Sequence, residues 1–136
     1  MNPSLSNQLM AESDTLVFVF GSNQRGIHGA GAAKAALRWG AQRGVGRGLQ
    51  GRTYALPTKV GPYTNFTLKD IQYEVEEFIE CVHDHPDLEF LVTPVGTGLA
   101  GHKAQDIAPF FEPLVDHPRV TLPIQFLTHL LKGEQL

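Results

Sequence analysis

Stretches of apolar residues along the chain alternate with polar stretches that are rich in glycine. Residues 15–20 read TLVFVF, and this continuous run of β-branched and aromatic residues predicts a strand buried on both faces, as in a parallel sheet. Residues 88–95, LEFLVTPV, predict a second strand of the same type. Two shorter strands are expected at 52–56, where Pro57 ends the run, and at 119–122.

The segments between these strands show apolar residues at helical spacing. Residues 67–85 place apolar side chains three and four positions apart, which predicts an amphipathic helix, and Thr67 with Asp70 favours a capped N-terminus. Further helices are expected over 30–43, 103–115 and 124–132. Four glycines within 44–51 indicate a mobile connection.

The alternation of strands and helices predicts an α/β fold. Right-handed crossovers would place helices on both sides of a largely parallel central sheet, in three layers (α/β/α). The 136 residues fit one domain, which we expect over 15–136. Residues 1–14 carry no such pattern and are expected to form a flexible N-terminal arm.

Composition supports a globular protein and narrows its partners. Hydrophobic residues make up 42% of the chain and charged residues 18%, which is not the balance of a disordered protein. The net charge of -3 argues against nucleic acid as a partner, because no overall positive field attracts it. A local basic group nevertheless exists, and it consists of Arg38, Arg43, Arg47 and Arg52.

The cysteine count and the N-terminal sequence indicate the compartment. Cys81 is the single cysteine, so the chain can form neither an internal disulfide nor a cysteine zinc site. We see no signal peptide and no apolar run of membrane-spanning length. The sequence therefore predicts a soluble, cytoplasmic protein without a membrane partner, a metal ion or a cofactor.

Two glycine-rich loops directly follow the two buried strands. Residues 21–31 read GSNQRGIHGAG and residues 96–101 read GTGLAG. Glycines let a backbone approach a ligand closely, and the amides of such loops and of a following helix can hold phosphate. The spacing matches neither a Walker loop nor a dinucleotide-binding fingerprint, and turns that merely require glycine are the alternative explanation. Because parallel strands end at one edge, we expect both loops to converge there.

The strings VFGSN…HGAGAA, LPTK and VTPVGTGLAG together resemble a macrodomain over roughly residues 16–114. The most similar subgroup is the terminal ADP-ribose protein glycohydrolase type, and short phage and bacterial proteins share the pattern FVFGSN…GRHGAGAA…GCGLAGY. The resemblance implies that Asn23 faces the distal ribose, that residues 28–31 form one phosphate loop and that residues 96–99 form the other. The full set of expected ligand-binding residues is Gly21, Ser22, Asn23, His28, Gly29, Ala30, Gly31, Thr58, Gly96, Thr97, Gly98, Leu99, Ala100 and Gly101.

The same resemblance implies catalytic roles for Lys59 and His28. Lys59 stands where the glycohydrolase subgroup has a lysine nucleophile, although a surface lysine would read the same in the sequence. His28 lies between glycines and is expected to be exposed or to face the ligand, where it would act as an acid. The aspartates that hydrolytic relatives place beside these loops are Ala33 and Ala100 here. The remaining candidates are Asp106 or Glu112 as the missing carboxylate, and Asp14 as an adenine ligand.

The resemblance therefore predicts binding of ADP-ribose or a related nucleotide, with or without hydrolysis. The partner would be an ADP-ribose-like small molecule or an ADP-ribosylated macromolecule. One alternative is a protein that sequesters a cyclic or other ADP-ribose-derived signal without turnover. Another is a nucleic-acid-associated accessory protein that uses the arginine group.

Overall fold

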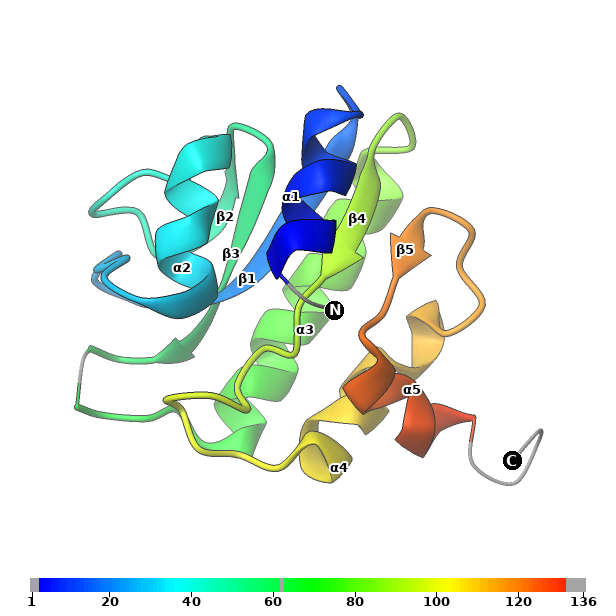
Figure 1. Cartoon of the computed structure of the whole chain (residues 1–136). Helices are drawn as coiled ribbons and strands as arrows, with labels where there is room; N and C mark the ends of the chain where they lie inside the picture. Colours follow the sequence, from blue (N-terminus) through cyan, green and yellow to red (C-terminus); the bar gives the residue numbers. More distant parts are fainter. Residues whose placement is uncertain (1–2, 62, 132–136) are drawn as a thin grey trace.

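The computed structural model describes residues 3–61 and 63–131, and its centre is a five-stranded, mostly parallel sheet (Figure 1). The strand order is β2-β3-β1-β4-β5. The central strand β1 (Leu16–Asn23) pairs in parallel with β3 (Thr53–Lys59) and with β4 (Glu89–Val92). The short β5 (Val120–Thr121) extends the sheet in parallel beyond β4. The predicted α/β class and largely parallel sheet are confirmed.

The outer strand β2 (Gly48–Gln50) runs antiparallel to β3 and lies within the segment that was expected to be a mobile connection. That expectation is wrong because the Gln50 side chain anchors the segment. Its Oε1 accepts a hydrogen bond from the Gln42 N–H at 2.6 Å, and its Nε2 donates to the Val45 carbonyl at 3.2 Å. The glycine-rich segment therefore contains an ordered edge strand.

Helices cover both faces of the sheet, and each face has its own apolar core. Alternate residues of β1 point to opposite faces, as a strand requires. Val17 and Val19 belong to a core with the long helix α3 (Leu68–Asp84). Phe18 and Phe20 belong to a core with α1 (Pro3–Ala11) and α2 (Gly31–Ala36). In Figure 1, α1 and α2 lie in front of the sheet and α3 lies behind it.

The N-terminal segment is a helix and not the flexible arm that the sequence suggested. Helix α1 spans Pro3–Ala11, and its residue Met10 is fully buried in the core beside Phe18 and Phe20. The apolar spacing of this segment is too weak to predict a helix. Burial of Met10 against the sheet supplies the stabilisation instead.

The other helices follow the predicted order, but two of them are short. Helix α3 is confirmed, with the capping box of Thr67 and Asp70 formed in both directions. Helix α5 spans Ile124–Leu130, and Lys132 of the predicted helix lies outside the described residues.

The helix predicted over 30–43 is α2 (Gly31–Ala36) followed by one 3₁₀ turn, η1 (Leu37–Trp39), because Gly40 takes a left-handed φ of 115°. The helix predicted over 103–115 is α4 (Ala104–Ile107) followed by the 3₁₀ segment η2 (Ala108–Leu114). Two prolines within η2 remove N–H donors that an α-helix needs.

Strand β3 continues through Pro57, where the sequence predicted its end. Pro57 lies opposite Ser22, and the pairing register shifts between Ser22 and Asn23, so that Asn23 pairs with Lys59. Such irregularities accommodate a residue without an N–H donor. The extension brings Lys59 to the edge where β1 ends.

No helix within residues 3–61 and 63–131 is both long and apolar enough to span a bilayer.

Candidate functional site

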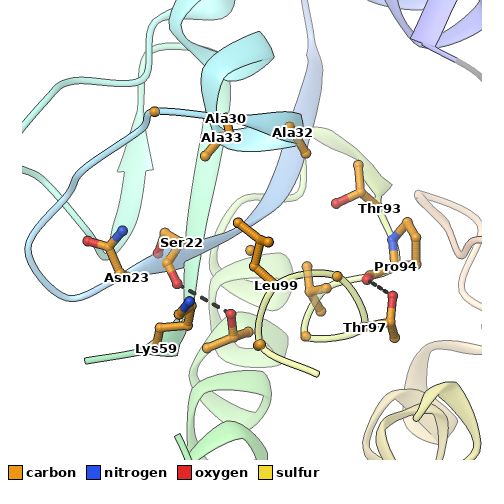
Figure 2. A pocket seen from close by; sticks show the side chains of 18 of the residues that line it. Ser22, Asn23, Ala30, Ala32, Ala33, Lys59, Thr93, Pro94, Thr97 and Leu99 are labelled. Atoms are coloured by element: carbon orange, nitrogen blue, oxygen red, sulfur yellow. Dashed lines mark hydrogen bonds between the residues drawn. The ribbon is translucent and has the colours of Figure 1, made fainter. Parts of the chain in front are cut away.

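The carboxyl ends of β1, β3 and β4 meet at one edge of the sheet, and the chain that follows them encloses a cleft of about 610 Å³ (Figure 2). This volume is in the range of pockets that hold small organic ligands. The start of α2, with Ala32 and Ala33, borders one side of the cleft, and the loop that carries Leu99 lies across from it. The two glycine-rich loops therefore converge at one edge, as the parallel direction of the two strands predicted.

Most of the residues expected from the sequence line this cleft. Those in the lining are Gly21, Ser22, Asn23, Gly29, Ala30, Gly31, Thr58, Lys59, Gly96, Thr97, Gly98, Leu99 and Ala100. Two expected residues, His28 and Gly101, are not in the lining. The expected ligand-binding set lacked Ile27, Ala32, Ala33 and the segment 93–95. The segment 93–95 was missed because β4 was expected to continue to Val95, whereas it ends at Val92. Pro94 was the available signal for this earlier end.

The glycines of the two loops fall into two kinds. Gly96 has a φ of 79°, and a methyl group on it would meet Ile107 at 2.5 Å, so the fold itself requires glycine there. Gly29 and Gly98 have no left-handed φ, and a methyl group on either would meet no atom beyond its chain neighbours within 4 Å. Local structure does not explain glycine at these two positions. The open space beside them lets another molecule approach the backbone closely.

Both loops contribute residues with unused backbone N–H groups to the cleft lining. Gly29, Ala30, Gly98 and Leu99 are exposed, and within the described part of the chain their N–H groups donate to no protein acceptor. Unused amide donors from two loops that face one cleft suit an anionic group, above all a diphosphate. Helix α2 has only six residues, so the loop amides rather than a helix terminus supply the donors.

Apolar side chains stand beside these donors. Leu99 is 81% exposed and Ile27 is 47% exposed, and both line the cleft. An exposed apolar side chain at a cleft can cover the flat face of a base or a sugar. The cleft thus combines unused N–H donors with exposed apolar side chains.

His28 is a buried residue, contrary to the expectation that it is exposed or faces the ligand. Its side chain is 2% exposed, and its Nε2 lies 2.9 Å from the carbonyl oxygen of Gln42 and 3.2 Å from that of Val45. Its ring meets Phe20 edge to face, with the ring centroids 5.3 Å apart. Flanking glycines misled the sequence interpretation, because here they let the loop fold over the histidine.

Asn23 lines the cleft, but its amide group closes its own loop. Its Nδ2 donates to the Ile27 carbonyl at 2.9 Å and its Oδ1 accepts from the Ile27 N–H at 3.0 Å. The Ser22 hydroxyl donates to the Gly46 carbonyl, and the Thr58 hydroxyl donates to the Ser22 carbonyl at 3.3 Å. These polar side chains therefore shape the cleft, and the backbone carries most of its capacity to bind.

Lys59 is half-buried at the end of β3 and lines the cleft beside Ser22 (Figure 2). Among the described residues of the lining it is the only one with an ionisable side chain. Ala33 and Ala100 also line the cleft. A carboxylate that could act as general base or acid is therefore missing from the described lining.

The three substitutes considered in the sequence do not fill this gap. Asp14 precedes the first residue of β1, at the opposite end of the strand from the cleft. Asp106 and Glu112 are exposed on α4 and η2, and neither lines the cleft.

Comparisons of the chain with protein-family models, with curated proteins and with solved structures gave no match.

Proposed function

We propose that this protein binds ADP-ribose, or a nucleotide derived from it, in the cleft at the carboxyl edge of the sheet, and that its fold is a three-layer macrodomain. One observation carries the proposal: two loops that follow parallel strands line one cleft with residues whose N–H groups have no protein acceptor, and among them Gly29 and Gly98 have open space where a side chain would stand. A diphosphate would lie between the loops, and Leu99 and Ile27 would cover the attached sugars or base.

Binding without turnover is the form of this function that we favour. Glycoside hydrolysis gains about 10²–10⁴-fold from a positioned acid or base, and the described lining offers only Lys59 among ionisable side chains. A protein that sequesters its ligand needs only the two binding loops and no catalytic acid or base. Hydrolysis through Lys59 as nucleophile is the second candidate, and it is supported by the position of this lysine in the cleft.

Titration calorimetry with ADP-ribose tests the proposal, and Gly98→Val is the informative variant. The valine side chain enters open space at a position without a left-handed φ, so the fold is retained while the loop amides are obstructed. We expect affinity for ADP-ribose to fall at least about tenfold, the factor that corresponds to one lost charge-assisted hydrogen bond.

Ala35→Val is the matched control, because Ala35 is exposed on α2 and lies outside the cleft lining. It should leave the affinity unchanged. Absence of saturable heat for the unaltered protein at millimolar ADP-ribose contradicts the proposed function. Equal affinity of Gly98→Val and the unaltered protein would place the ligand elsewhere.

A further inference from the structure

Charge is strongly segregated along this chain, although its net value is small. Eight lysines and arginines, and no aspartate or glutamate, stand between positions 15 and 69. The rest of the chain carries all fourteen acidic residues and three basic ones. The basic half contains β1, α2, β2 and β3, and therefore the first glycine-rich loop. Such asymmetry creates a positive field on one part of an acidic protein.

Three of the basic side chains in this half have structural partners. Arg47 forms an ion pair with the buried Glu74 of α3. Arg52 donates to the carbonyl oxygens of Ser13 and Leu16, and its guanidinium lies 5.3 Å from the Trp39 ring centroid. Arg38 lies over the same ring at 5.2 Å. These contacts give three of the eight positive charges partners within the fold.

The remaining basic side chains between positions 25 and 52 converge on one place. Arg25, Lys34 and Arg43 all line a pocket of about 460 Å³, and all three are exposed. No carboxylate within the described residues pairs with any of them, and none lines this pocket. Three cations without a counter-charge around one concavity form a site for an anion.

Buried contacts fix the shape of this basic pocket. The loop before α2 and the loop after it are joined by a hydrogen bond of 2.9 Å from the Gly44 N–H to the Gly26 carbonyl. Any side chain on Gly26 would meet Gly44 within 2.4 Å, so the two backbones touch. The buried His28 adds its bond to Gln42, next to Arg43. His28 lines the pocket, and its Nδ1 is buried without a hydrogen-bond partner among the described residues.

The basic pocket continues from the cleft. Ile27 and Gly29 line both cavities, and the N–H of Gly29 is among the unused donors. A ligand that fills the cleft can therefore extend past Gly29 toward Arg25, Lys34 and Arg43.

We propose that the basic pocket binds a further phosphate monoester of the nucleotide held in the cleft, so that the preferred ligand is an ADP-ribose-like nucleotide with at least one phosphate beyond its diphosphate. This inference rests on the proposed function. A phosphate monoester fits because it carries close to two negative charges and three acceptor oxygens, which match the three cations. A nucleic-acid strand would need an extended basic track. Arg38, Arg47 and Arg52, which such a track would use, are committed to contacts within the fold.

Calorimetry with three probes at low salt tests the inference. The probes are ADP-ribose, ADP-ribose phosphorylated on the 2′ hydroxyl of its adenosine ribose, and ADP-ribose phosphorylated at the anomeric position of its distal ribose. We expect one phosphorylated form to bind at least about tenfold more tightly than ADP-ribose, from several modest ion pairs acting together. Arg43→Ala and Lys34→Ala should remove this advantage and change the affinity for ADP-ribose itself less than twofold. Arg38→Ala is the control for general charge and should preserve the advantage.

The outcomes separate this inference from the proposed function. If ADP-ribose binds and neither phosphorylated form binds more tightly, the basic pocket inference is wrong and the proposed function stands. If no nucleotide binds, an amide NMR titration with inorganic phosphate decides. Saturable shifts at Gly26, Gly29 and Gly44 that vanish in Arg43→Ala support the pocket, and their absence overturns it. A single-stranded oligonucleotide that binds more tightly than every nucleotide, and loses affinity in Arg43→Ala, also overturns the inference.

Discussion

The Nε2 atom of His28 lies 2.9 Å from the carbonyl oxygen of Gln42, and this contact joins the loop before α2 to the loop after it. A carbonyl oxygen only accepts, so Nε2 carries the proton and donates to it, and to the Val45 carbonyl at 3.2 Å. His28 therefore holds together the walls of the basic pocket, and it does not contact the cleft. Its role is to position a loop.

We predict that His28→Ala destabilises the fold by about 2–4 kcal/mol, because a buried ring is lost and two carbonyl oxygens lose their donor. Urea denaturation followed by circular dichroism measures the change. His129→Ala, on the exposed side of α5, is the matched control and should stay within about 0.5 kcal/mol. A His28→Ala protein of unaltered stability would show that the contacts of His28 with Gln42 and Val45 do not stabilise the fold.

His28 also shows where sequence reasoning fails. The buried runs of β1 and β4 and the spacing of α3 express local patterns, and the sequence predicted these elements together with the edge on which both loops meet. The burial of His28 depends on Gln42 and Val45, which follow it by 14 and 17 residues. A histidine between glycines reads the same whether it faces solvent or lies beneath a second loop. Tertiary contacts that no local pattern encodes decide between the two.

Helix α1 and Pro57 also depend on contacts with residues that are distant in the sequence. The helix exists because Met10 finds a place against Phe18 and Phe20, which lie in a different element. Pro57 stays in β3 because the register shift beside it removes the need for its N–H. In the cleft, the sequence identified the glycines but could not separate those that the fold requires from those with open flanks.

The ion pair between Arg47 and Glu74 ties the segment before β2 to α3, and we predict a measurable coupling energy between them. Arg47 Nε donates to Glu74 Oε1 at 3.0 Å, and the Glu74 side chain is only 4% exposed. The hydrogen bond to Glu74 is the main reason that the pKa of Arg47 is raised. Arg47→Ala leaves a buried carboxylate without its partner and should cost about 1–3 kcal/mol. The half-exposed Arg47 side chain places the value toward the lower end.

A double-mutant cycle with Glu74→Ala isolates this interaction from the effect of each truncation. Glu77→Ala is the control, since Glu77 is exposed on the same helix and should not couple to Arg47. Additive losses for Arg47→Ala and Glu74→Ala would mean that the pair contributes nothing beyond the separate side chains.

Cys81 should react slowly with thiol reagents. Burial, with a smaller contribution from Asp84, raises the pKa of its thiol to about 11 from the usual value of 9.0. Because only the thiolate is the nucleophile, we expect an alkylation rate at pH 8 about a hundredfold below that of an unperturbed cysteine. The rate should climb about tenfold per pH unit up to pH 10. A rate that levels off near pH 9 would show that access alone, and not the pKa, limits the reaction.

The cleft itself leads to the last prediction, binding of ADP-ribosyl compounds without cleavage. Lys59 is the only ionisable side chain among the described residues that line it, and no carboxylate stands in that described lining. An amine at this place can attract a diphosphate whether or not it attacks an anomeric carbon. We therefore expect Lys59→Ala to weaken ADP-ribose binding about three- to tenfold, the range of a partly exposed ion pair.

Chromatography of an ADP-ribosylated peptide after long incubation distinguishes binding from turnover. Intact peptide recovered from both the unaltered protein and Lys59→Ala is the expected result. Lys69→Ala, which removes the same charge from the exposed surface of α3, should leave both binding and the peptide unchanged. Release of free ADP-ribose that disappears in Lys59→Ala and persists in Lys69→Ala would instead make Lys59 a nucleophile. Hydrolysis would then have to proceed without a carboxylate in the described lining, and the half-buried lysine would have to be neutral at the moment of attack.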